Sequence, residues 1–300
     1  MGNLSKADSK ATTDDGPAPP PSYTETTQAP NADAHTLPTY DQILMNPVVS
    51  PYHSFPSLIN AYYQWKITRE FHLGEDRNQR LYCVSTHAGL TSRGPGKPGV
   101  ILHNGPTGKH PMLAAAGEEP NWNIYSLNSI ITLPPLPGSS SKMSTEIMRA
   151  STKQNTIRFQ FSIEVGQGLH LRREDFEWRK SNGDEDKELV EPPWTCGFKL
   201  MRSSQHDGEG NCRTASGTSE AIANGSEEVL AVFAWSSRWS LTMPFKIQFR
   251  KGGLVDVMGE RFTLMVIITA LRLWGLKHQG RTSSSTVTSG EAGIVPGATG

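Results

Sequence analysis

The sequence lacks the patterns from which catalytic and metal sites are usually recognised. It holds three cysteines among 300 residues, and no two of them form a C-x-x-C pair. An odd, widely spaced set, in a chain without a secretory hydrophobic segment after Met1, predicts a reducing cytoplasmic location without disulfides. The sequence also contains no H-E-x-x-H and no G-x-S-x-G motif. We therefore expect no metal, no cofactor and no enzymatic activity.

The chain has no excess of charge of either sign. It carries 29 basic and 29 acidic residues, so its formal net charge is zero. Residues 1–50 hold two lysines against six acidic residues, a balance of −4, which leaves +4 for the remainder. That excess is too small to indicate a nucleic-acid partner, for which a strongly basic face is expected.

The longest apolar run, residues 261–276, is too short for an ordinary membrane span. From Phe262 to Leu276 the only charge is Arg272, and apolar side chains occur at every angle around a helix. Fifteen residues reach roughly 22 Å as a helix, whereas a bilayer's hydrocarbon core measures roughly 30 Å. A short tail anchor and a buried strand are the alternative interpretations, but strands usually end near ~8 residues. We predict a helix enclosed by protein, with its C-terminal end near Lys277 and His278.

The N-terminal residues 1–56 are predicted to be a disordered tail. Residues 1–50 contain seven of the 21 prolines, many small polar residues and little that could form a core. The start M-G-N-L-S-K makes Gly2 a candidate for myristoylation, although the pattern asks for Ser or Thr where Lys6 stands.

Two short proline-tyrosine motifs lie in this tail. The first is a PPxY motif at 20–23, and the second is its LPxY variant at 37–40. Prolines favour the extended polyproline II helix that WW domains bind in an aromatic groove, while the tyrosine fills the adjoining pocket. A plain linker is the alternative interpretation. The predicted WW-binding residues are Pro20, Pro21, Tyr23, Leu37, Pro38 and Tyr40.

Residues 57–280 are predicted to form a single β-rich domain. Residues 157–165 alternate strictly between apolar and polar side chains, as expected for a strand with one buried face. Alternate apolar residues from Tyr63 to Leu73 predict another strand. The apolar parity changes before Phe176 and Trp178, which predicts a β-bulge or a break near 173–175.

The remaining segments are predicted to be loops or tails. Residues 203–226 are polar and aperiodic, so we expect a mobile loop, and residues 281–300 are expected to be a second disordered tail. The glycines at 105–109 faintly resemble a phosphate loop but lack its spacing, so we interpret them as a turn. Scattered histidines such as His103 and His110 are interpreted as isolated surface or core residues.

Ten to twelve short strands followed by one all-apolar helix predict a closed antiparallel β-barrel around a buried C-terminal helix. Closure removes the sheet edges and surrounds the helix on all sides. At this point the chain resembles the tubby C-terminal-like superfamily, which includes the LURP-one-related proteins and the phospholipid scramblases. It looks closest to fungal members through F-E-W-R-K-S-N-G at 176–183 and the block at 259–281. The resemblance covers about 57–280.

The resemblance implies phosphoinositide or membrane-surface binding. The candidate residues are Lys246, Arg250 and Lys251 near the last strand, or the basic pair Arg172 and Arg173, with a solvated strand face as the alternative interpretation. We expect a monomeric adaptor, peripheral at membranes, whose tail recruits a WW-domain protein such as a HECT-type ubiquitin ligase. A scramblase-like protein that handles phospholipid directly is the alternative.

Overall fold

The computed structural model describes eleven segments of the chain, which together hold the whole barrel. They are residues 50–51, 53–63, 70–87, 98–119, 127–136, 142–153, 156–166, 170–181, 190–203, 228–236 and 242–292.

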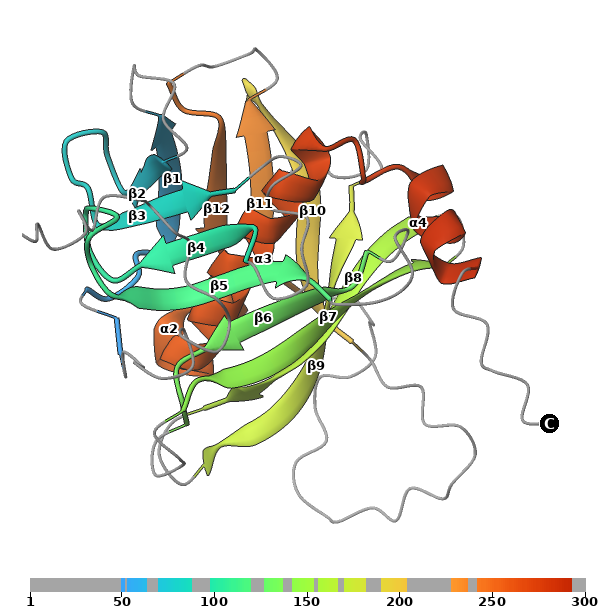
Figure 1. Ribbon diagram of the computed structural model, residues 1–300, viewed down its shortest axis with the longest axis horizontal. Helices are drawn as coiled ribbons and strands as arrows, with labels where there is room; N and C mark the ends of the chain where they lie inside the picture. The colour runs from blue at the N-terminus through green and yellow to red at the C-terminus, as the bar shows by residue number, and fades with distance from the viewer. Residues whose placement is uncertain are drawn as a thin grey trace, which may run out of the picture. The chain divides into compact units, whose positions relative to one another are not determined.

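Twelve antiparallel strands form one closed barrel (Figure 1). Each strand pairs with its neighbours in the sequence, and β1 closes the ring by pairing with β12, with Ile59 opposite Ile247. The strands are β1 (Leu58–Tyr63), β2 (Glu70–Gly74), β3 (Tyr82–Thr86), β4 (Val100–His103), β5 (Met112–Glu118), β6 (Ser129–Leu133), β7 (Ser144–Lys153), β8 (Thr156–Val165), β9 (Arg172–Lys180), β10 (Trp194–Arg202), β11 (Val229–Ser236) and β12 (Phe245–Phe249). They are followed by η3 (Lys251–Gly253), α2 (Val255–Met258), α3 (Glu260–His278) and α4 (Ser284–Ala292).

Helix α3 runs through the centre of the barrel, with β4, β5 and β6 crossing in front of it in Figure 1. Its residues from Phe262 to Leu276 are buried, apart from the partly exposed Gly275. Lys277 and His278 form its last turn, and Gly280 follows with a φ of 68°. The predicted enclosed helix is therefore confirmed, because apolar side chains on every side of α3 meet the inward-facing residues of the wall.

Two polar side chains inside the barrel form hydrogen bonds between the helix and the wall. The indole nitrogen of Trp178 donates to Thr269 Oγ1 at 2.9 Å. Arg272, only 2% exposed, donates from Nε to Ser129 Oγ at 2.9 Å. These bonds join the helix to β9 and β6 and satisfy groups that would otherwise be costly to bury.

The barrel begins earlier than the predicted boundary at residue 57. Phe55 is buried and stacks on Tyr82 with ring centroids 4.7 Å apart. The Tyr82 hydroxyl also bonds the backbone of His53, and Asn104 donates to the Ser50 carbonyl at 2.9 Å. The prediction of a disordered tail to residue 56 was therefore wrong for these last residues, which pack on the barrel. Residues 1–49 lie outside the described part of the chain.

The boundary predicted at residue 281 was also too early. Residues 284–292 form α4, which lies beside β7 and β8 (Figure 1). Val287 is 1% exposed, and Ser283 Oγ accepts a hydrogen bond from the Thr286 backbone at 3.3 Å, which caps the helix. Residues 293–300 lie outside the described residues, as does all of the predicted loop at 203–226 except Ser203.

Two local strand predictions were wrong. The apolar residues from Tyr63 to Leu73 do not share one strand, because β1 and β2 pair as neighbours with Tyr63 opposite Phe71. Strand β9 runs from Arg172 to Lys180 in unbroken register with β8, without the predicted bulge. The change of parity is explained by Leu171, which lies just before the strand.

Candidate functional site

Between β7 and β8 the barrel wall has an interval that side chains, rather than the backbone ladder, bridge. Strands β7 and β8 pair from Lys153 opposite Thr156 to Arg149 opposite Gln160, and among the described residues their ladder ends there. We call the unpaired interval, between residues 144–148 of β7 and 161–165 of β8, the seam. The start of α3 lies beside the seam, where Gly166 donates its backbone N–H to the Met258 carbonyl at 3.0 Å.

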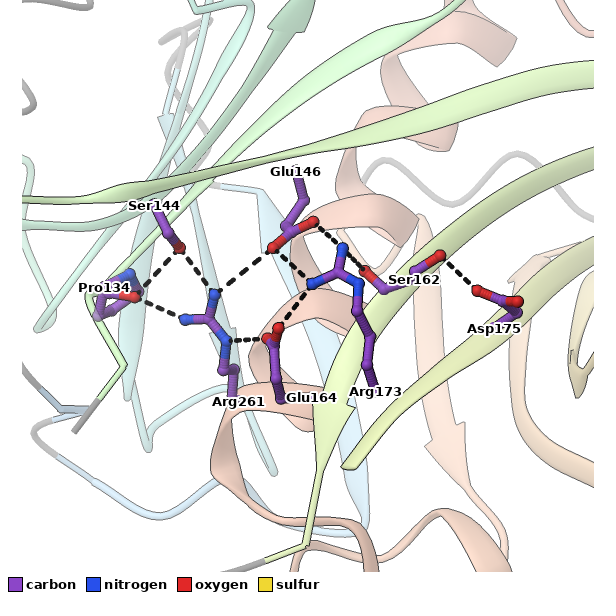
Figure 2. A network of polar contacts seen from close by, with 8 residues as sticks. All are labelled: Pro134, Ser144, Glu146, Ser162, Glu164, Arg173, Asp175 and Arg261. Carbon is purple, nitrogen blue, oxygen red and sulfur yellow. Dashed lines mark hydrogen bonds and ion pairs between the residues drawn. The ribbon is translucent and has the colours of Figure 1, made fainter. Parts of the chain in front are cut away.

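Arg261, in the first turn of α3, fills the seam from inside (Figure 2). Its Nε donates to Glu164 at 2.8 Å, and its two terminal nitrogens donate to the Pro134 carbonyl at 2.6 Å and to Ser144 Oγ at 2.7 Å. A cation at a helix N-terminus opposes the helix dipole, so Arg261 is unfavourable there unless carboxylates compensate it. The seam supplies them, and Arg261 thereby ties the helix to β6, β7 and β8.

Arg173, from β9, reaches the same carboxylates from the other side of β8 (Figure 2). It donates to Glu164 at 2.6 Å, to the Ser162 carbonyl at 3.3 Å, and forms an ion pair with Glu146. These carboxylates raise the pKa of the Arg173 guanidinium, the Glu146 hydrogen bond contributing most. The two arginines and two glutamates thus form a closed network across the seam.

The charges of this network cancel, so it offers little attraction to an anion or a metal ion. Burial is the largest single influence on Glu164 and would raise its pKa, but the hydrogen bond and charge of Arg261, a backbone hydrogen bond and the hydrogen bond from Arg173 together outweigh it, so the pKa lies below its ordinary value. Glu164 therefore stays ionised at neutral pH. Among the described residues no group of histidine, cysteine and acidic side chains is arranged to hold a metal. The network acts as a clasp that fixes the helix to the wall.

Replacing Arg261 with methionine should destabilise the barrel by about 2–4 kcal/mol. The change keeps much of the side-chain volume but leaves Glu164 and Glu146, both largely buried, without this partner. Urea unfolding followed by tryptophan fluorescence measures the free energy of unfolding. Arg172→Met is the matched control, because Arg172 is 67% exposed and its single ion pair with Glu174 should contribute less than about 1 kcal/mol. If both variants lowered the free energy of unfolding equally, the hydrogen bonds of Arg261 would not contribute specifically to stability.

The predicted basic pair Arg172 and Arg173 is not an isolated patch of positive charge. Arg172 pairs with Glu174, which also forms an ion pair with Arg202 at 2.9 Å, while Arg173 belongs to the clasp. Asp175 on the same strand accepts from Ser162. Nearby carboxylates thus compensate these arginines, which makes this face of β8 and β9 a poor site for anionic headgroups.

The second predicted group lies on the outside of β12. Lys246 and Arg250 share the outward parity, and the positive charge of Arg250 contributes to a lowered pKa of Lys246, although burial is the larger cause. Lys246 Nζ lies 4.9 Å from the centroid of the Trp194 ring. Lys251, the first residue of η3, is exposed. The three cations therefore lie along and just beyond β12, and their role in binding lipid stays a prediction.

The remaining predicted site residues lie outside the described part of the chain. They are Gly2, the PPxY motif at 20–23 and the LPxY motif at 37–40. Their roles stay predictions. Within the described residues no helix is long and apolar enough to cross a membrane.

The comparisons with known proteins give no family for this chain. No model of a known protein family matches it, and searches of curated proteins and of solved structures found no similar protein. The resemblance to the tubby C-terminal-like superfamily therefore stays a prediction, and a function has to be argued from the residues and the fold.

Proposed function

We propose that the chain is an adaptor whose N-terminal tail recruits a WW-domain protein, such as a HECT-type ubiquitin ligase, while its barrel binds an anionic membrane surface. The observation that supports this proposal is that the barrel and the two motifs occupy separate parts of the chain. Twelve strands between Leu58 and Phe249 complete the barrel, and both proline-tyrosine motifs precede its first described residue, Ser50. The strands of the barrel therefore do not include either motif.

The contacts of residues 50–55 set how far a recruited partner can be from the barrel. Ser50 and Phe55 are held by Asn104 and Tyr82. Ten residues separate Tyr40 from Ser50, and a fully extended chain of that length spans at most about 33–36 Å. A WW domain on the second motif would thus stay within one domain diameter of the barrel surface. Such tethering raises the effective concentration of a recruited enzyme near anything that the barrel holds.

The outward cations Lys246, Arg250 and Lys251 support binding to anionic lipid. Each cation close to a negatively charged membrane contributes about 1 kcal/mol, so three give roughly a hundredfold in affinity. The enclosure of α3 favours this peripheral role over the scramblase-like alternative, because direct handling of phospholipid would require the helix to contact lipid. The phosphoinositide preference implied by the family resemblance is part of the proposal.

Changing Lys246, Arg250 and Lys251 together to glutamate should weaken binding to phosphoinositide-containing vesicles at least about 100-fold. Co-sedimentation of the full chain with vesicles of increasing lipid concentration measures the affinity. The matched control reverses three exposed cations elsewhere, Lys142, Arg149 and Lys153, which alters the net charge equally. Equal binding by wild type and the first variant would remove this surface from the proposal, and equal losses in both variants would indicate only nonspecific attraction.

A further inference from the structure

A second cluster of reactive side chains lies on the outer face of β2, β3 and β4, away from the seam and the β12 edge. The strand register places Glu70 opposite Ser85, and Cys83 opposite His103. The connection between β4 and β5, residues 104–111, folds over these side chains. Sequence reasoning treated His103 and His110 as isolated, but the fold brings them into direct contact.

The hydrogen bonds of His103 determine which of its nitrogens carries the proton. Nδ1 lies 3.0 Å from the backbone carbonyl of His110, and a carbonyl can only accept, so Nδ1 carries hydrogen. In the neutral ring Nε2 is then an acceptor. Ser85 Oγ lies 2.9 Å from Nε2, so the serine hydroxyl donates to it. The serine proton is already directed at a base whose orientation is fixed by a third group, the arrangement that activates a serine nucleophile.

Burial keeps His103 neutral, and Glu70 favours the charged form that proton transfer would create. The pKa of His103 lies below its ordinary value because burial outweighs the hydrogen bond from the His110 carbonyl and the attraction of Glu70. The Glu70 carboxylate also lies 3.4 Å from Ser85 Oγ. An imidazolium formed at His103 would therefore face a negative charge, as the histidine of a serine hydrolase faces its aspartate.

Cys83, the other potential nucleophile beside His103, is made unreactive by its surroundings. It is 0% exposed, and burial, followed by the charge of Glu70, raises the pKa of its thiol to about 12. The thiolate is the reactive form of cysteine, so Cys83 stays inert at neutral pH. Ser85 is left as the nucleophile of the cluster.

The β4–β5 connection forms a lid over the cluster. His72 Nε2 donates to the Pro106 carbonyl at 2.9 Å, and the backbone N–H of Cys83 donates to the Gly105 carbonyl at 2.7 Å. The lid lies close against Glu70 at Gly108, where an added Cβ would come within 2.5 Å of Glu70 Oε1 and the carboxylate would have to shift. Ser85 is only 7% exposed beneath it. A substrate would reach Ser85 when the lid lifts, and such loop movements commonly gate active sites.

We propose that Ser85 is an acyl-accepting nucleophile and His103 its general base, acting on small carboxylic esters. Ser85 Oγ bonds to the ester carbonyl carbon as its proton moves to His103 Nε2, which then protonates the leaving alcohol as the C–O bond breaks. Water attacks the acyl-serine, gives its proton to His103 and releases the carboxylic acid, while Ser85 recovers its proton from His103. This activity goes beyond the adaptor role, does not rest on it, and contradicts the sequence-based expectation of no enzymatic activity.

The full chain incubated with a fluorophosphonate probe tests the proposal, read out by intact mass and peptide mapping. We expect one adduct, on Ser85, and none in Ser85→Ala. His103→Asn retains a donor for the His110 carbonyl but has no base, so labelling should slow at least about 100-fold. The matched control is His72→Gln, whose amide can still donate to the Pro106 carbonyl and which should be labelled at Ser85. With p-nitrophenyl acetate the wild type should release a burst of about one p-nitrophenolate per chain.

The pH dependence of labelling separates catalysis from a merely structural hydrogen bond. The groups that face His103 are Glu70, Cys83 and His110, and the pKa of His103 lies below its ordinary value, chiefly because the ring is buried. The wild-type labelling rate should rise with pH through one ionisation below about 6.5 and then level off. Absence of an adduct on Ser85, an adduct elsewhere only, a flat pH profile, or unchanged labelling of His103→Asn would each overturn the proposal.

Discussion

Replacing Ile267 with aspartate should leave the chain unfolded at room temperature. Ile267 lies near the middle of α3 and is 0% exposed, with buried side chains before and after it along the helix. A carboxylate there would lose its water without gaining a partner, at a cost of several kcal/mol even if it became protonated. Total stabilities of natural domains are about 5–15 kcal/mol, so one such group can exceed what this barrel can tolerate.

Two controls distinguish burial of charge from loss of shape at Ile267. Val257→Asp introduces the same carboxylate on α2, where the residue is 59% exposed, and should change stability little. Ile267→Val removes one methylene and should cost about 0.5–1.5 kcal/mol. Far-UV circular dichroism and urea unfolding of the three variants give the comparison. A cooperatively folded Ile267→Asp chain would mean that α3 is not enclosed by the strands.

Replacing Tyr23 and Tyr40 together with alanine should abolish binding of a tandem WW protein to the full chain. In the first motif both prolines can occupy the aromatic groove while Tyr23 enters its pocket. Leu37 of the second motif keeps the apolar contact but lacks the ring that fixes φ, so more conformational entropy is lost on docking. Tyr23→Ala should therefore cost more than Tyr40→Ala, and about 2 kcal/mol or more is typical when an aromatic anchor is lost.

Calorimetric titration of the full chain with single and tandem WW domains measures these differences. Thr24→Ala is the matched control, because it changes the residue next to the first motif without touching the motif itself. Wild type should bind the tandem protein more tightly than either single-tyrosine variant, since the spacing of seventeen positions from Tyr23 to Tyr40 lets both motifs engage together. If the double variant binds as tightly as wild type, the tail acts only as a linker and the recruiting half of the adaptor fails.

The sequence predicted the barrel's interior better than its polar contacts. Helix α3 and strand β8 were predictable because their apolar residues form long, regular patterns. The positions of the apolar residues in such patterns indicate which side chains are buried. Strand β7 escaped prediction because only Met148 among its ten residues is fully buried, and Ile147 faces outward. Because β7 packs against a polar network, its sequence does not alternate between apolar and polar residues, and it could not be recognised as a strand from the sequence.

The two side-chain clusters could not be predicted because their members are far apart in the sequence. Arg261 meets Glu164 across 97 positions, and Ser85 meets His103 across 18. The first pair depends on where the ladder between β7 and β8 ends, and the second on the register of β3 and β4, neither of which a single sequence records. A signal did exist for Arg261, because an arginine in the first turn of a helix predicts acidic neighbours.

The central position of α3 also determines how the protein has to be synthesised. The helix is the last part of the barrel to be translated, although all twelve strands pack around it. At about 5–20 residues per second, the roughly 220 residues from Leu58 to His278 take about 11–44 s to emerge. During that time the nascent sheet has no interior to cover its apolar face, and its open edges can pair with other chains. A chain truncated before residue 260 should therefore aggregate, because its sheet would lack the helix that covers the apolar inner face.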